Sequence, residues 1–335
     1  MSAARPTIRR KLRNYRRRAA RRWHFHRSSR GGFVEWNRDY RRTLLLVSSA
    51  RSGSTWLSDI LEESLRCRMI FEPLRRDKVP LAQNVPWGMY SDPSQPDPEL
   101  DAVLRRMLSG RVRNRWSDKF NRYRLTRRRL VKEVRATNLL PRIVENFPDM
   151  PIVYLLRHPI PTAWSAAKLH WLPYLKEFFR QPQLMEGPMA PMQGAIDDTM
   201  ADKDLFQRHV LRWCLENYIP VNHLATGSVH VVFYEDIVQD PDKELDRLRA
   251  YLGRFPGHLW TMPPQRPAAV DLPSRANYRE TPLLPVEQRL GSWRDEVPED
   301  RIRFALDLVT RFGLDRIYDL DVRPRVGVDD VLLGP

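Results

Sequence analysis

The chain contains 335 residues, which is enough for one large domain or two small ones. Its two cysteines, Cys67 and Cys214, argue against a secreted domain held by disulfides and favour a reducing compartment. No stretch approaches about 18 consecutive apolar residues, and the charged N-terminus is not followed by the apolar core of a secretory signal. We therefore expect a cytoplasmic protein without a transmembrane helix.

The formal net charge of +16 is concentrated at one end of the chain. Residues 1–30 contain twelve Arg or Lys and no Asp or Glu, whereas the remaining residues include 45 basic and 41 acidic ones. We expect this basic arm to be a disordered solubilising tail, a contact for an anionic membrane surface that uses Trp23 and Phe25, or a non-specific nucleic-acid binder. The arm, rather than a folded motif, carries the charge, which disfavours nucleic-acid binding as the main function.

Residues 44–57, LLLVSSARSGSTWL, are the most informative segment. The apolar run predicts a strand over Thr43–Ser48 that is covered on both faces, and the apolar residues after the turn recur at helical spacing. The turn itself is rich in small residues and contains Gly53. A helix that begins after such a turn directs its N–H groups and positive dipole end at an anion, usually a phosphate, and Arg51 adds a full charge.

A second segment has the same organisation. Ile152–Leu156 (IVYLL) contains β-branched and aromatic residues, which favours another buried strand. The strand ends in Arg157 and Pro159, and we expect a helix over Thr162–Lys168. Ser165 follows Arg157 by eight residues. An arginine fork and a hydroxyl on the next helix can converge on one phosphate.

The first segment does not match the nucleotide P-loop, G-x-x-x-x-G-K-[ST], because no glycine precedes Gly53 by five residues and no lysine precedes Ser54 or Thr55. Taken together, the two segments resemble sulfotransferases that use the donor PAPS (3′-phosphoadenosine 5′-phosphosulfate). The resemblance implies that the first loop binds the 5′-phosphosulfate. The loop residues so implied are Arg51, Ser52, Gly53, Ser54, Thr55 and Trp56.

The same resemblance implies that Arg157 and Ser165 bind the 3′-phosphate of the donor. The family often has a second arginine where this chain has Ile160, so one phosphate contact is missing while the main pair is kept. The resemblance extends from about Thr43 to about Tyr318, which is most of the chain.

Met69–Leu74, MIFEPL, resembles a Phe-Glu-Pro-Leu stretch of carbohydrate-type sulfotransferases whose glutamate acts as the catalytic base. Glu72 has that position here, and its apolar neighbours are expected to raise the pKa of the carboxyl into a useful range. Arg51 is the other residue implied in catalysis, because it neutralises charge on the leaving phosphate. The alternative is an ordinary loop glutamate paired with Arg75 or Arg76.

Residues 105–135 form a second basic cluster, with thirteen Arg or Lys against Asp118 and Glu133. This cluster is either a solvated pair of helices or a surface that receives an anionic acceptor and steers the anionic donor. Family members often have a Lys or Arg near the acceptor at the positions of Lys132 and Arg135. These two residues are therefore our candidates for acceptor binding.

Two later stretches fit the same family. Residues 229–253 predict a strand over His230–Tyr234, an acidic turn and a helix, with Glu235 and Asp236 bracing the turn near the donor loop. Closer to the C-terminus, the resemblance implies a mobile basic loop that folds over the adenosine and the 3′-phosphate, although a plain basic surface loop is an equal alternative. The candidate donor-binding residues there are Arg275, Arg289 and Ser292.

The expected strands alternate with helices, which indicates an α/β fold: one P-loop-like domain with a mostly parallel central sheet flanked by helices. We assign this domain to residues 43–320 and a C-terminal tail to residues 321–335. A helix is expected over Gln207–Asn222 and another over Arg301–Phe312. Residues 170–205 read as a long irregular segment, either a lid over the substrate or a satellite core.

These features predict a sulfotransferase that moves a sulfuryl group from PAPS to an acceptor hydroxyl, releases PAP and needs no metal. The resemblance favours a carbohydrate or glycolipid acceptor, while a lipid or polyketide alcohol or a peptide tyrosine stays open. We expect a bacterial, cytoplasmic enzyme, either free or peripheral to the membrane through residues 1–30. The alternatives are a divergent P-loop kinase, opposed by the missing Gly-Lys-Ser/Thr, and a basic nucleic-acid-binding protein without catalysis.

Overall fold

The computed structural model describes residues 34–35, 37–256, 260–275 and 284–334. The predicted basic arm over residues 1–30 and part of the predicted C-terminal loop therefore lie outside the described residues. Throughout the described ranges, the helices are all too short or too polar to cross a bilayer.

A five-stranded sheet in the order β3-β5-β2-β6-β7 forms the centre of the fold, and all neighbouring strands in it are parallel. These strands are β2 (Thr43–Ser48), β3 (Arg68–Phe71), β5 (Arg129–Glu133), β6 (Ile152–Leu156) and β7 (His230–Phe233). A separate short ladder joins β1 (Val34–Glu35) to β4 (Leu125–Thr126). The predicted α/β fold with a parallel central sheet is confirmed.

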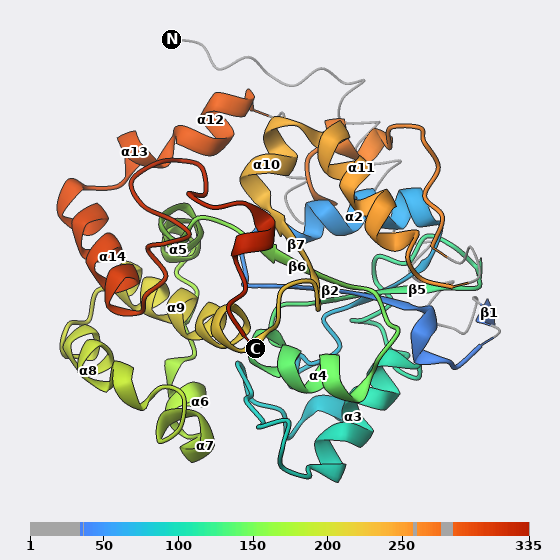
Figure 1. The fold of residues 1–335 in the computed structure, drawn as a ribbon, viewed down its shortest axis with the longest axis horizontal. Coiled ribbons are helices and arrows are strands. Elements are labelled where there is room, and N and C mark those ends of the chain that lie inside the picture. The colour runs from blue at the N-terminus through green and yellow to red at the C-terminus, as the bar shows by residue number, and fades with distance from the viewer. Residues whose placement is uncertain (1–33, 36, 257–259, 276–283, 335) are drawn as a thin grey trace.

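Helices cover both faces of the sheet (Figure 1). One face packs against α2 (Ser54–Leu65) and α11 (Pro241–Leu252), and the other against α3 (Pro98–Leu108) and α4 (Leu140–Asn146). The short helix α10 (Tyr234–Gln239) joins β7 to α11.

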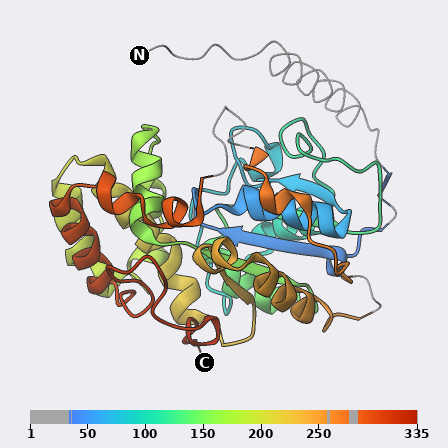
Figure 2. The same ribbon diagram turned by 90° about the horizontal axis from the view of Figure 1, so that it is seen from above.

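The remaining helices gather on the left of Figure 1, past the carboxyl ends of the strands, and Figure 2 shows the same group from above. They are α5 (Pro159–Lys168), α6 (Leu175–Phe179), α7 (Pro182–Met185), α8 (Gln193–Ala201), α9 (Leu205–His223), α12 (Val286–Gly291), α13 (Trp293–Glu296) and α14 (Glu299–Arg311). Ligands of open parallel sheets bind at this edge.

The apolar run over residues 44–47 is continuous because the central strand β2 is covered on both faces. Leu44 and Leu46 pack into the core on the side of α2 and α11, while Leu45 and Val47 pack into the core on the opposite side. All four side chains are fully buried. Successive side chains of a strand point to opposite faces, so a strand covered on both faces needs apolar residues at every position.

The predicted element boundaries agree well at two strands and less well elsewhere. Thr43–Ser48 and Ile152–Leu156 are confirmed to the residue. The third strand ends at Phe233, because Tyr234 begins α10 in place of the predicted acidic turn. Helix α5 begins at Pro159, three residues before the predicted start, since proline suits the first turn of a helix.

The prediction of an irregular segment over residues 170–205 is wrong. This segment contains α6, α7 and α8, and its Phe178, Leu184 and Ile196 side chains are buried in the core. The frequent Pro and Gly concealed these helices in the sequence, because a proline in the first turn, as Pro182 in α7, starts a helix, although proline also breaks helices.

Candidate active site

Residues 49–53 connect β2 to α2 and place the start of α2 at the carboxyl edge of the sheet. Arg51 and Gly53 both have positive φ angles, 73° and 87°, so the chain turns tightly. Only glycine fits at position 53, because a Cβ there would lie 2.5 Å from the Tyr234 ring. No side chain caps α2, so its first N–H groups are available to an anion.

The two segments predicted to bind the donor meet at this turn. The Arg51 Nε donates a hydrogen bond to the Ser165 Oγ at 3.0 Å, and an Arg157 guanidinium nitrogen donates to the Arg51 carbonyl at 3.0 Å. Burial, together with the nearby Arg157 charge, lowers the pKa of Arg51. Within the described part of the chain, neither arginine forms an ion pair with a carboxylate. Two adjacent cations without counter-charges favour the approach of a multiply charged anion.

Arg157 is held by contacts that leave its charge unneutralised. Its guanidinium lies over the Tyr234 ring, 4.2 Å from the ring centre, and its carbonyl accepts a hydrogen bond from the Trp213 indole at 3.0 Å. Its Nε is buried and has no hydrogen-bond partner among the described residues. An unsatisfied buried donor of this kind fits a phosphate oxygen.

Buried polar contacts keep the turn after β6 in place. The Glu235 carboxylate accepts hydrogen bonds from the His158 N–H at 2.9 Å and from the Tyr318 hydroxyl at 3.0 Å. His158 caps α5 by accepting from the Ile160 N–H, and burial lowers the pKa of His158 to about 4. A neutral, capping imidazole positions Arg157 and is not in the imidazolium form that a general acid needs near neutral pH.

Glu72 lies immediately after β3 and forms ion pairs with both predicted acceptor residues. Its carboxylate contacts the Lys132 Nζ at 2.8 Å and an Arg135 guanidinium nitrogen at 3.2 Å. Burial acts to raise the pKa of Glu72, but the two cations outweigh it and bring the pKa to about 2. The expectation of a raised pKa is therefore wrong, and so is the alternative pairing with Arg75 or Arg76.

An aromatic layer links the Glu72 cluster to the donor loop. Arg135 lies over Trp87, 4.3 Å from its ring centre, and Trp87 stacks on Tyr174 at 5.1 Å. Arg51 in turn lies 5.2 Å from the ring centre of Trp171. Trp171 and Tyr174 belong to an exposed apolar segment, residues 169–174. The donor loop and Glu72 thus line one region of the carboxyl edge.

The three C-terminal candidates have different positions. Arg275 forms ion pairs with Asp59 and Glu62 of α2, so the structure does not bring it to the donor loop. Arg289 lies over Trp56, 5.6 Å from the ring centre, and its Nε is buried without a partner among the described residues. Ser292 connects α12 to α13 and is only partly buried. Arg289 is thus the C-terminal candidate that lies beside the first turn of α2, next to the donor loop.

The pattern in the sequence missed two contacts of the donor loop. Tyr234 packs against both Gly53 and Arg157, although the run around it was interpreted as a brace formed by Glu235 and Asp236. Ser49 accepts a hydrogen bond from the Asn217 amide of α9 at 3.0 Å. The position of Tyr234 directly after an apolar strand was the available signal, since parallel strands end at one edge.

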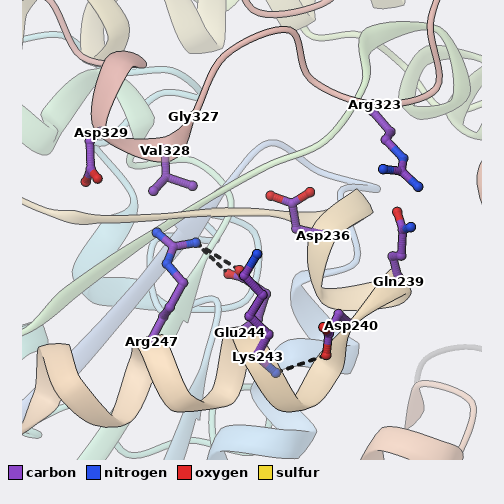
Figure 3. Close-up of a pocket in the computed structure, with 10 residues that line it drawn as sticks. All are labelled: Asp236, Gln239, Asp240, Lys243, Glu244, Arg247, Arg323, Gly327, Val328 and Asp329. Carbon is purple, nitrogen blue, oxygen red and sulfur yellow. Dashed lines mark hydrogen bonds and ion pairs between the residues drawn. The ribbon is translucent and has the colours of Figure 1, made fainter.

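A pocket of about 610 Å³ lies apart from these residues, between α10, α11 and the C-terminal segment (Figure 3). It contains none of the predicted site residues, and its Arg247 and Glu244 pair with each other at 2.9 Å. In the described part of the chain, no group of three or more His, Cys, Asp or Glu residues is arranged to bind a metal ion.

The geometry brings two arginines and the uncapped start of α2 together at a strand–loop–helix turn, with the Glu72 carboxylate at the same edge of the sheet. The profile of the sulfotransferase family matches residues 44–255, which include the loop, Glu72, Arg157 and Ser165. The chain belongs to the sulfotransferase family.

Several solved structures are similar to this chain. The sulfotransferase domain from the curacin biosynthetic pathway is 16% identical, with 86% of this chain and 100% of that one covered and a TM-score of 0.41. The sulfotransferase domain from the Synechococcus PCC 7002 olefin synthase is 17% identical, with 83% of this chain and 95% of that one covered and a TM-score of 0.42. Mouse sulfotransferase SULT7A1 complexed with PAP is 15% identical, with 89% of this chain and 90% of that one covered and a TM-score of 0.37. No curated protein sequence matches the chain.

Proposed function

We propose that this protein transfers a sulfuryl group from PAPS to a hydroxyl of a carbohydrate or glycolipid. The observation that carries the proposal is the meeting of Arg51, Arg157 and Ser165 at the start of α2, with two arginines that lack a described carboxylate partner. When bound, PAPS supplies the activated sulfuryl group. The loop residues and the first N–H groups of α2 hold its 5′-phosphosulfate.

Arg157 and Ser165 bind the 3′-phosphate in this proposal. The buried, unpartnered Nε of Arg157 offers a donor that the protein itself does not use. Arg51 lies between this position and the start of α2, so its charge stabilises negative charge that develops on the leaving phosphate. Arg289, beside Trp56, is a further candidate for the nucleotide, and Arg275 acts by holding α2 in place.

Glu72 accepts the proton of the acceptor hydroxyl. As a carboxylate with a pKa of about 2 it is ionised at neutral pH, but it is a weak base while both cations bind it. We propose that the acceptor hydroxyl displaces Arg135, which also contacts Glu133 at 3.3 Å and so retains a partner. Loss of one cation raises the pKa of the Glu72 carboxyl toward the range useful for proton transfer.

The surface beside the site supports an acceptor with an apolar face. Trp171 and Tyr174 are 41% and 43% exposed, and Leu172 between them is 66% exposed. Exposed aromatic rings next to a catalytic edge suit the C–H face of a sugar or the chain of a glycolipid. Peripheral contact with a membrane through residues 1–30 and a cytoplasmic, bacterial setting remain predictions from the sequence.

Calorimetric titration with PAP, 5′-AMP and ATP–Mg²⁺ tests the donor site. We expect PAP to bind at least about tenfold more tightly than 5′-AMP, because a charge-assisted contact with the 3′-phosphate contributes roughly 1.5–3 kcal/mol. Arg157→Ala removes this preference, whereas Arg303→Ala on the exposed side of α14 keeps it. Equal affinity for PAP and 5′-AMP, or a preference for ATP–Mg²⁺, contradicts the proposal and returns attention to a kinase.

A further inference from the structure

We propose that Lys119 forms a binding subsite for an anionic group of the acceptor, so that the preferred acceptor is an acidic rather than a neutral carbohydrate. The proposal rests on the proposed function and names the acceptor class of that site. It assigns a role to one residue of the basic cluster over residues 105–135, whose purpose the sequence left open.

Three aromatic rings surround the Lys119 ammonium group. Its Nζ lies 3.4 Å from the ring centre of Trp116, 4.1 Å from that of Phe71 and 4.7 Å from that of Phe120. Phe71 makes edge-to-face contacts with Trp116 and with Phe120, at 5.5 Å and 4.8 Å between ring centres. The rings fix the position of the ammonium group by cation–π attraction.

Lys119 is charged, partly buried and without a carboxylate partner in the described part of the chain. Burial and the nearby Lys132 and Arg75 charges lower the pKa of Lys119 to about 8, and the Glu72 carboxylate opposes this shift. The ammonium group is therefore mostly protonated at neutral pH. Removing a charge from water is unfavourable without a counter-charge, and the aromatic rings offset only part of this cost. The charge of a bound anion offsets the remainder of this desolvation cost.

The ammonium group lies beside the proposed proton acceptor. Phe71 directly precedes Glu72, and the Lys132 Nζ that binds Glu72 is 4.8 Å from the centre of the same Phe71 ring. Lys132 and Arg135 direct their charges to carboxylates, and Arg75, which stacks on Trp116, pairs with Asp77. An acceptor whose hydroxyl reaches Glu72 therefore brings its neighbouring groups to the charge of Lys119.

Ligand-observed NMR titration of the full chain tests the subsite with three simple probes: methyl β-D-glucuronide, glucose 6-sulfate and neutral methyl β-D-glucoside. Each titration is run with and without saturating PAP, so that the result does not depend on the donor site. We expect the wild type to bind the two acidic sugars about tenfold more tightly than the neutral one. Lys119→Met removes this difference, and Lys119→Arg retains most of it.

Lys203→Met is the matched control, because Lys203 is an exposed lysine between α8 and α9. Lys119→Gln replaces Lys119→Met if the latter does not fold. Binding of the acidic and neutral sugars with equal affinity by the wild type overturns the proposal, as does a preference that survives in Lys119→Met. Normal PAP binding with no preference for acidic sugars refutes the Lys119 subsite alone, whereas failure to bind PAP refutes the donor site alone.

Discussion

The carboxyl edge of the sheet carries two groups of cations that differ in their partners. Arg51 and Arg157, after β2 and β6, contact a hydroxyl, a backbone carbonyl and aromatic rings. Lys132 and Arg135, at the end of β5 and just beyond it, pair with Glu72. Among the described residues the first group has no ion pair with a carboxylate, whereas the second neutralises a carboxylate of the protein.

The presence or absence of a carboxylate partner determines whether a cation can attract a ligand or instead holds a protein side chain in place. Adjacent cations without a counter-charge repel each other, so an anionic ligand gains the full electrostatic attraction. A buried carboxylate between two cations has little attraction left for a ligand but a well-defined position. In the proposed function, Arg51 and Arg157 therefore contribute affinity for the donor, and the two cations around Glu72 hold its carboxylate in a fixed position for the acceptor.

The largest expected effect comes from removing a charge on the donor side. Arg51→Ala lowers turnover about 10²–10³-fold, because it removes a preorganised charge at the leaving phosphate. It also weakens PAP binding, measured by calorimetry. Arg303→Ala, with its exposed side chain on α14, serves as the control and keeps both properties. Full activity in Arg51→Ala rules out the loop as the donor site.

Removing the charge of Glu72 tests the other side of the comparison. Glu72→Gln lowers kcat about 10²-fold, since the amide cannot take the acceptor proton, while the affinity for PAP stays within about twofold. The variant also leaves Lys132 and Arg135 without their shared carboxylate, so its melting temperature falls. Glu145→Gln on the exposed side of α4 is the matched control. An equal loss of kcat and PAP affinity points to a structural role for Glu72.

A smaller effect tests whether Arg157 lacks a counter-charge. Burial raises the pKa of Glu235 to about 7, although three hydrogen bonds and the Arg157 charge oppose the shift. Because the folded pKa exceeds the ordinary value of 4.5, the stabilisation from this carboxyl is complete below pH 4.5 and is lost as the pH rises through 7.

Glu235→Gln is uncharged at every pH and removes this dependence. We expect the wild type to lose roughly 1–3 kcal/mol of unfolding free energy relative to the variant between pH 5 and pH 8. Urea unfolding at several pH values measures the difference. Parallel curves for the two proteins mean that Glu235 is ionised in both the folded and unfolded states, and that it neutralises Arg157.

The convergence of Arg157 and Ser165 on the donor loop was predictable, because β2 before the loop and β6 before Arg157 could both be recognised from their apolar runs. The partners of Glu72 were not. Lys132 was identified as a candidate for acceptor binding, yet its ion pair with Glu72 depends on the pairing of β3 with β5, in which Phe71 is opposite Lys132. Neither strand was predicted, since both are short and contain charged residues.

Arg275 is a second example of an ion pair that could not be predicted from the sequence, and its partners are farther away along the chain. The resemblance placed it near the nucleotide, but the fold pairs it with two carboxylates of α2 that lie more than 200 residues earlier in the chain. A basic residue in a loop attracts any anion within reach, so its partner depends on which helix surface packs beside it.

The strand–loop–helix turn, the buried strands β2 and β6 and the family could be recognised without the structure, because they depend on local spacing and on apolar runs. Which cations pair with a carboxylate, in contrast, depends on how the elements pack. The strand order brings Lys132 and Arg135 into ion pairs with Glu72. The other cations, Arg51, Arg157 and Lys119, contact aromatic rings. Charges interact through space and not along the chain, so their pairing follows from packing.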